Sequence, residues 1–201
     1  METKIATTQT ELTAILALGE SVHLNLCGWP ETGDIYLRGA KTGDIDLRGA
    51  ETGDIDLRGA KTGYIDLRGA ETGYIDLKGA KTGYIYLRRA NTGYIYLTGT
   101  KINGYSVHRL TDQRKLLARC AQTILAHPET LNMSNWHSCP TTHCLAGHAV
   151  VIGEAQEMEK YIGPEMAGLI LLGPEAAKRF FDSNKSVLSW LASKGHKNDC
   201  V

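Results

Sequence analysis

The sequence predicts an α+β protein: a parallel β-helix, or solenoid, of short repeats, with an N-terminal helical cap and an all-α C-terminal domain. Three observations predict this fold. A ten-residue unit runs seven times without a gap from Glu31 to Thr100, a capped helical pattern precedes it, and helix-period segments replace it after Arg109. We therefore expect a cap over residues 1–21, a solenoid over 22–108 and a helical domain over 109–201.

Each repeat unit holds one short strand. Ile and Leu recur two residues apart, as in Ile45 and Leu47, with polar residues between and after them, so that apolar and polar side chains alternate. Glycines before and after each pair supply the tight turns that a wound strand requires. Repeats of such a short period stack coil on coil into a solenoid.

One half of each unit resembles the pentapeptide-repeat family, whose unit is a small or apolar residue, Asp or Asn, Leu or Phe, a polar residue and Gly. The segment Ile45-Asp46-Leu47-Arg48-Gly49 has this order, whereas Ala50-Glu51-Thr52-Gly53-Asp54 departs from it with Thr at its centre. The resemblance covers residues 31–100 and implies a square coil of twenty residues. Many members of that family are protein-binding rods that imitate DNA.

The charge pattern favours a different coil. Glu and Lys alternate at ten-residue steps, at Glu31, Lys41, Glu51, Lys61, Glu71 and Lys81. Coils of ten residues would stack opposite charges about 4.8 Å apart, whereas coils of twenty would stack like charges, which destabilises a sheet. The sequence leaves coils of ten and of twenty residues both open.

Tyrosine gathers toward the C-terminal end of the repeat, where Tyr replaces Asp at two positions of the unit. Since Tyr is enriched at binding hot spots, we expect a binding surface at Tyr64, Tyr74, Tyr84, Tyr94, Tyr86 and Tyr96. The alternative is a stacked ladder of rings that stiffens the sheet. A column of Thr also suggests ice binding, unless each Thr hydrogen-bonds its own turn.

Charge and cysteine content narrow the classes of function. With 22 Lys plus Arg against 22 Asp plus Glu the chain is neutral, so charge supports neither a DNA mimic nor a nucleic-acid partner. Five scattered cysteines argue for a reducing compartment and against a disulfide framework. The first nineteen residues lack an apolar signal core, and the longest apolar run is too short for a bilayer. We therefore expect a cytoplasmic protein without a membrane partner.

Regions outside the repeat predict further elements. Residues 8–20 predict a capped helix, residues 22–29 an imperfect first coil and residues 104–107 a last imperfect strand. After Arg109 the apolar spacing predicts helices over residues 112–127, 142–161, 164–172, 174–182 and 186–193.

A dense group of Cys and His lies between Trp136 and His148 and supports three hypotheses. The first is a zinc site at Cys139, Cys144, His148 and either His137 or His143, because zinc prefers thiolate and imidazole ligands. The second is catalysis by Cys144 with His148, since a first helical turn lowers a thiol pKa. This segment resembles, weakly, the nucleophile segment of papain-like proteases, but the distant His and Asn of those enzymes have no counterpart here. The third is ordinary core packing.

The segment from His127 to Phe181, with Trp136, Cys139, Cys144, Ala146 and Gly147 at its centre, is also similar to short helical domains of bacterial and phage proteins, from which no activity carries over. Together the observations predict a non-enzymatic protein-binding scaffold without a cofactor, a rigid neutral solenoid whose Tyr-rich end modulates or inhibits a macromolecular partner. The alternative is a Cys/His-dependent enzyme or a zinc-binding protein that uses Cys139, His143, Cys144 and His148. A homodimer of solenoids that meet end to end or face to face is compatible with either.

Overall fold

The chain folds into two compact units, Met1–Arg109 and Leu110–Val201. The structure, a computed structural model, describes residues 2–19, 21–29, 33–107, 112–139 and 141–195, with the side chains of Ser138 and Cys139 outside that description. The first unit is the predicted parallel β-solenoid and the second is mostly helical, so the α+β fold class is confirmed.

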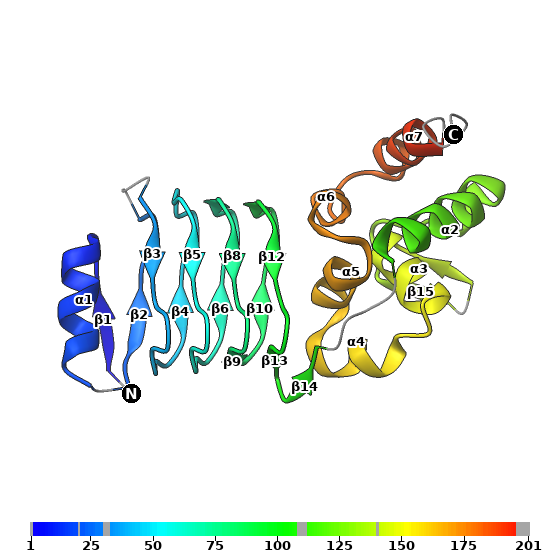
Figure 1. The fold of residues 1–201 in the computed structure, drawn as a ribbon. Helices are drawn as coiled ribbons and strands as arrows, with labels where there is room; N and C mark the ends of the chain where they lie inside the picture. Colours follow the sequence, from blue (N-terminus) through cyan, green and yellow to red (C-terminus); the bar gives the residue numbers. More distant parts are fainter. Residues whose placement is uncertain (1, 20, 30–32, 108–111, 140, 196–201) are drawn as a thin grey trace. The chain divides into compact units, whose positions relative to one another are not determined.

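The coil of the solenoid contains twenty residues. Ile45 pairs in parallel with Ile65, and Ile55 pairs with Ile75, so each coil holds two ten-residue repeats. Figure 1 shows these coils stacked side by side along one axis. The coil size implied by the pentapeptide-repeat resemblance is therefore the one adopted, and the ten-residue coil favoured by the charge pattern is wrong.

Two parallel sheets form opposite faces of the solenoid. We call face A the sheet β1-β2-β4-β6-β10 and face B the sheet β3-β5-β8-β12. Face A consists of β1 (Thr3–Ile5), β2 (His23–Asn25), β4 (Ile45–Asp46), β6 (Ile65–Asp66) and β10 (Ile85–Tyr86). Face B consists of β3 (Ile35–Tyr36), β5 (Ile55–Asp56), β8 (Ile75–Asp76) and β12 (Ile95–Tyr96).

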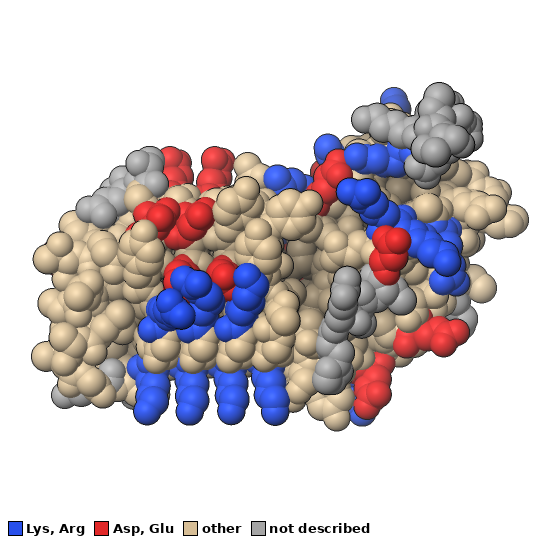
Figure 2. All heavy atoms as spheres, in the orientation of Figure 1, with Lys and Arg blue, Asp and Glu red and all other residues tan. Residues whose placement is uncertain are grey.

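Two edges connect the faces, and each carries one sign of charge. On the edge that we call the lysine edge, Lys41 pairs with Lys61, Lys61 with Lys81, and Lys81 with Lys101. On the glutamate edge, Glu51 pairs with Glu71 and Glu71 with Asn91. The edges contain β9 (Lys81–Thr82), β13 (Lys101–Ile102), β7 (Glu71–Thr72) and β11 (Asn91–Thr92). In Figure 2 basic side chains stand in a row along the lower border of the solenoid, and acidic ones project from the upper border.

Apolar burial outweighs the stacking of like charges. Two unit charges 4 Å apart in water interact by only about 1 kcal/mol, and salt screens them further. Burying one Ile or Leu side chain contributes roughly 1.5–3 kcal/mol. The coil that contains Ile45, Leu47, Ile55 and Leu57 buries all four to 1% exposure or less. The repulsion between stacked exposed lysines therefore destabilises the solenoid less than burial of its Ile and Leu side chains stabilises it.

The threonine column does not form an exposed row. Thr42 and Thr82 are 6% exposed. Each donates its hydroxyl to the carbonyl of the following Gly, at 3.1 Å for Thr42 and 2.9 Å for Thr82. The Thr hydroxyls therefore stabilise their own turns, as the alternative to ice binding predicts.

The N-terminal end of the solenoid is covered by helix α1 (Gln9–Ala17), as Figure 1 shows. Thr8 is the N-cap and accepts a hydrogen bond from the Glu11 amide, which confirms the predicted capped helix. Leu12 of this helix is fully buried. Strand β2 pairs with β4, so the predicted imperfect first coil is confirmed, and β1 adds one more strand beyond it.

The last strand of the solenoid runs backward. β14 (Tyr105–Ser106) pairs antiparallel with β13, with Ile102 opposite Tyr105. Asn103 and Gly104 have positive φ, which makes the tight turn between the two strands. The final strand expected at residues 104–107 is present, but it folds back as a hairpin.

The second unit packs short helices around a small apolar core. These are α2 (Gln113–Ala126), α3 (Leu145–Ile152), α4 (Gln156–Ile162), α5 (Pro164–Leu172), α6 (Pro174–Ala177) and α7 (Asn184–Gly195), with a 3-10 turn at Pro128–Thr130. A β-hairpin of β15 (His137–Cys139) and β16 (Thr142–His143) precedes α3, so the unit is not all-α as predicted. The helix expected over residues 142–161 is divided in two, because α3 ends at the C-cap Gly153 and the next residue, Glu154, has a positive φ.

Candidate functional site

The tyrosines predicted as a binding surface lie in two clusters on opposite faces. Tyr64, Tyr84 and Tyr86 form cluster A on face A, with ring centroids 6.1 Å apart for Tyr64 and Tyr84 and 6.2 Å apart for Tyr64 and Tyr86. A ten-residue step carries the chain to the other face. The twenty-residue coil therefore divides the tyrosines that the sequence lists as one group.

Cluster B repeats this arrangement on face B, ten residues later. The ring centroids of Tyr74 and Tyr96 are 6.1 Å apart, and those of Tyr94 and Tyr96 are 6.5 Å apart. The exposed fractions are 49% for Tyr74, 62% for Tyr94 and 39% for Tyr96. Tyr94 and Tyr96 stack as the ladder hypothesis predicts, Tyr74 and Tyr96 are tilted against each other, and all three rings remain open to solvent as a binding surface requires.

A basic side chain covers one ring in each cluster. The guanidinium carbon of Arg68 lies 5.8 Å from the centroid of the Tyr86 ring. The Lys78 ammonium lies 4.4 Å from the centroid of Tyr96. Both distances are within the range of a cation–π interaction. Each tyrosine cluster is thus an aromatic surface with a positive charge held over it.

The faces beside the clusters carry ion pairs that repeat with the coil. Arg48 Nη2 lies 2.6 Å from Asp46 Oδ2, and its Nε lies 3.8 Å from Asp66 of the next coil. Face B repeats the pattern, since Arg58 pairs with Asp56 and with Asp76. The Arg side chains hold the pKa values of Asp46 and Asp56 below the usual range of an aspartate, chiefly through their hydrogen bonds. Arg48, Arg58 and Arg68 are therefore neutralised by aspartates of the same faces.

The change from Asp to Tyr along the repeat changes how successive coils are joined. Asp44 Oδ1 accepts the backbone N–H of Tyr64, one coil later, at 2.8 Å, and Asp54 accepts that of Tyr74 in the same way. A Cβ at Gly63 would lie 2.0 Å from Asp44 Oδ1, so this contact requires glycine there. Tyr64 stands in the place of Asp44 one coil later, and its ring stacks on that of Tyr84.

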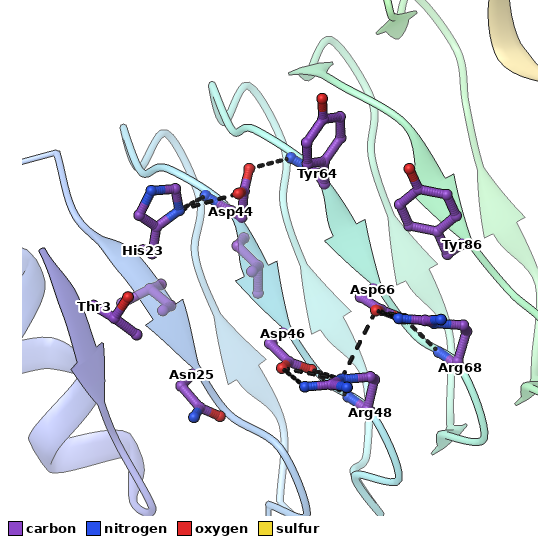
Figure 3. Close-up of a pocket in the computed structure, with 12 residues that line it drawn as sticks. Thr3, His23, Asn25, Asp44, Asp46, Arg48, Tyr64, Asp66, Arg68 and Tyr86 are labelled. Atoms are coloured by element: carbon purple, nitrogen blue, oxygen red, sulfur yellow. Dashed lines mark hydrogen bonds and ion pairs between the residues drawn. The ribbon is translucent and has the colours of Figure 1, made fainter. Parts of the chain in front are cut away.

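An open groove of about 510 Å³ lies on face A, between these side chains. Figure 3 shows His23 and Asp44 at one side of the groove, Asp46 paired with Arg48 below them, and Tyr64 and Tyr86 farther along. His23 Nδ1 accepts the Asp44 backbone N–H at 2.8 Å, the role that Asp44 itself plays one coil later. No local sequence motif marks this groove, because many of its residues lie about twenty positions apart in the chain.

The predicted Cys/His segment contains a chain of imidazoles. His137 Nδ1 lies 2.8 Å from His143 Nδ1, and His137 Nε2 lies 2.9 Å from a carboxylate oxygen of Glu159. Because the Glu159 carboxylate accepts, a neutral His137 carries its proton on Nε2, and His143 then donates through Nδ1. Nothing in the sequence pattern pointed to Glu159, which lies in α4, fifteen residues after Cys144.

His148 completes this segment in a different role. Its ring centroid lies 5.3 Å from that of His143, and its Nε2 lies 3.1 Å from the Thr130 carbonyl oxygen. His148 is 4% exposed, and this burial lowers its pKa below that of free imidazole. A backbone carbonyl only accepts, so His148 is the neutral Nε2–H tautomer and donates to the 3-10 turn at Thr130.

Cys144 does not have the environment of an activated nucleophile. It is the N-cap of α3 and its sulfur accepts the Gly147 backbone N–H at 3.3 Å. The thiol is 2% exposed, and burial raises its pKa to about 11. The predicted lowering of this pKa by the helix is wrong, because desolvation outweighs the N-terminal dipole.

The predicted metal ligands are brought together only in part. His143 and His148 are in ring contact and Cys144 is the cap beside them, whereas the Cys139 side chain lies outside the described residues. Among the residues that the structure describes, no group of three or more His, Cys, Asp or Glu is arranged to hold a metal ion. Over the same residues, no helix combines the length and apolar character needed to cross a bilayer.

These features define the class of the protein: a β-solenoid repeat protein with a second, helical unit and aromatic clusters on its two faces. Comparison with protein-family models, with curated proteins and with solved structures finds no match to the chain. The likeness to pentapeptide repeats therefore rests on the repeat sequence and on the twenty-residue coil.

Proposed function

We propose that this protein is a non-enzymatic protein-binding scaffold that presents tyrosine clusters A and B to a macromolecular partner and modulates or inhibits that partner by covering its surface. One observation carries the proposal: aromatic rings are exposed in ordered stacks on a rigid solenoid. Tyr64 is 48% exposed and Tyr86 is 41% exposed. An aromatic ring left in solvent gains no free energy of burial, so clustered exposed rings mark a surface that a partner could cover.

The arrangement suits binding for a physical reason. An interface loses affinity when it must immobilise side chains, and a Tyr ring has few torsions to lose. Here the rings are already held by each other and by a basic side chain, as Tyr86 is by Tyr64 and Arg68. A partner would therefore gain aromatic contact area at a small entropic cost, and its acidic groups would pair with the basic side chain over the ring.

The two clusters favour one kind of partner. Every member of cluster A has its counterpart ten residues later in cluster B, and Arg68 has its counterpart in Lys78. Surfaces of the same composition and spacing recognise the same chemistry. We expect both faces to bind copies of the same partner.

Two triple variants test the proposal: Y64A/Y84A/Y86A removes cluster A, and Y74A/Y94A/Y96A removes cluster B. A partner is first captured from the native host with the full chain and then purified for titration by calorimetry. Loss of one hot-spot tyrosine costs about 2 kcal/mol, or roughly thirtyfold in Kd. We therefore expect each triple variant to lose binding on one face by at least that factor.

The matched control is Tyr36→Ala. Tyr36 is 56% exposed on the same solenoid, but its hydroxyl is hydrogen-bonded to Asp34 and it lies in neither cluster. This variant should bind as the unaltered chain does. A partner that binds both triple variants and the control equally well would refute the proposal.

The chain of imidazoles favours a second candidate, a zinc-binding or Cys/His-dependent protein using Cys139, His143, Cys144 and His148. Its support is that His137, His143 and His148 lie in contact in one segment. Elemental analysis of the purified protein tests it, with Cys139→Ser and Cys144→Ala as variants. Zinc at one equivalent that both variants lose would favour this candidate, and a full biological effect of Cys144→Ala would exclude its catalytic form.

A further inference from the structure

The charges on the two edges of the solenoid differ from those on the faces. Lys41, Lys61, Lys81 and Lys101 are exposed on the lysine edge, and Glu51 and Glu71 are exposed on the glutamate edge. Within the described part of the chain, none of these six side chains forms an ion pair, whereas Arg48, Arg58 and Arg68 of the faces pair with Asp. Each edge thus carries a row of like charges that no ion pair compensates.

The two edges lie on opposite sides of the same solenoid. In each coil the chain passes from face A to the glutamate edge, then to face B, then to the lysine edge, as in the order β4, Glu51, β5, Lys61 and β6. Figure 2 shows the basic row and the acidic groups at opposite borders. The chain is neutral as a whole, but it carries a row of positive charges on one edge and negative charges on the other. The composition does not show this separation.

Both edges have the same axial period. Successive lysines and successive glutamates are each one coil apart, about 4.8 Å, because parallel strands set both spacings. The ammonium groups of one copy thus match the carboxylates of another over consecutive coils without any adjustment. A second copy of this chain therefore has both the opposite charge and the matching spacing that a partner of either edge needs.

We propose that the solenoids associate side by side, with the lysine edge of one copy against the glutamate edge of the next. Each contact uses a different edge on each copy, so every pair leaves one lysine edge and one glutamate edge free. Such heterologous contacts continue into open rows unless they close into a ring. The contact uses neither tyrosine cluster, and it is independent of the scaffold function.

The association is expected to be weak and sensitive to salt. Exposed ion pairs contribute little individually, and only Glu51 and Glu71 oppose the lysines among the described acidic residues of that edge. The Debye length falls from about 30 Å at 0.01 M salt to about 10 Å at 0.1 M, so added salt weakens the contact strongly. We expect the apparent Kd to rise at least about tenfold over that range.

Sedimentation velocity of the full chain tests the proposal at 0.01 M and 0.1 M sodium chloride over a range of protein concentrations. The expected result at low salt is a mean mass that increases with concentration and exceeds twice that of the monomer, and a return toward the monomer at high salt. The variants E51K/E71K and K41E/K61E/K81E/K101E give the described charged residues of both edges one sign, and each variant alone should stay monomeric.

Mixing these two variants tests most directly whether opposite edges bind each other. One copy then offers two basic edges and the other two acidic edges, so the mixture should regain association that neither variant shows alone. The matched control, E157K/K160E, exchanges two exposed charges on α4 and should behave as the unaltered chain does. A monomer at low salt, association that both edge variants retain, or a mixture that stays monomeric would each overturn the proposal. Circular dichroism of each variant separates a lost contact from a lost fold.

Discussion

The solenoid and the helical unit bury apolar side chains in two different ways. In the solenoid the same inward positions recur in every coil, and Ile65, Leu67 and Ala70 are each 1% exposed or less. In the helical unit the core depends on close fits between unlike residues. Gly168 allows helix α5 to approach Ala146 of α3, since an added Cβ would lie 2.5 Å from the Ala146 methyl carbon.

This difference has a consequence for how each unit responds to change. In a repeat architecture each coil contacts mainly its neighbours, so damage stays local in structure but interrupts the stack. In a small core with close fits, one added methyl group displaces several elements. Four substitutions or changes of condition separate the two cases, and we take them from the largest expected effect to the smallest.

Leu67→Ala should have the largest effect. Leu67 is 1% exposed in the centre of the solenoid, and truncation of such a side chain leaves a cavity that costs about 2–5 kcal/mol. Urea unfolding followed by circular dichroism measures the loss. Leu125→Ala is the control, because Leu125 is 38% exposed, and a comparable loss from both would contradict the account of the solenoid core.

Gly147→Ala should destabilise the helical unit by about 1–3 kcal/mol. The added Cβ would lie 2.3 Å from the Trp136 carbonyl oxygen and 2.9 Å from His143 Cβ, so the hairpin must move. Trp136 fluorescence during thermal unfolding reports the change, since that ring packs edge-on against Phe180. Gly33→Ala has no atom within 4 Å of the new Cβ and should have a much smaller effect.

Acid should weaken the helical unit through His148. Its folded-state pKa lies below the unfolded value, so below about pH 6.5 the unfolded chain binds more protons and the free energy of unfolding falls with pH. The neighbouring His143 and His137 rings add to this, since a charge on either disfavours a second on His148. Unfolding measured between pH 7.5 and pH 5 should show a flatter dependence for His148→Gln. An unchanged slope in that variant would exclude this role.

Arg58→Ala should have the smallest effect, below about 1 kcal/mol, because an exposed ion pair contributes little. Arg58 pairs with Asp56 on face B, and its side chain is 43% exposed. A double-mutant cycle with Asp56→Asn measures the pair, and the coupling should shrink as salt is added. A coupling above 2 kcal/mol that salt does not reduce would show that the faces are held by ion pairs more than by their core.

Local patterns predict most of the secondary structure. The Ile–Leu spacing predicts every strand of faces A and B within the repeat, and Thr8 followed by Glu11 predicts α1. Predictions fail where distant contacts decide. Strand β16 occupies the first residues of the helix predicted over 142–161, and burial of Cys144 reverses the pKa shift that its place beside a helix suggests.

The candidate sites show the same division. The tyrosines themselves follow from the sequence, but their separation into clusters A and B depends on which residues share a coil. Glu159 joins His137 across twenty-two residues with no motif between them. Contacts of this kind depend on the packing of α4 against the hairpin, which periodicity does not encode.

The sequence by itself determines that the repeat forms short strands and tight turns, because alternation and glycine act over a few residues. Only the tertiary structure decides that two repeats make one coil. That choice follows from closing the chain around Ile, Leu and Ala, whose burial outweighs the repulsion between exposed like charges. It converts an alternating line of Glu and Lys into two opposite edges, and one run of tyrosines into two faces.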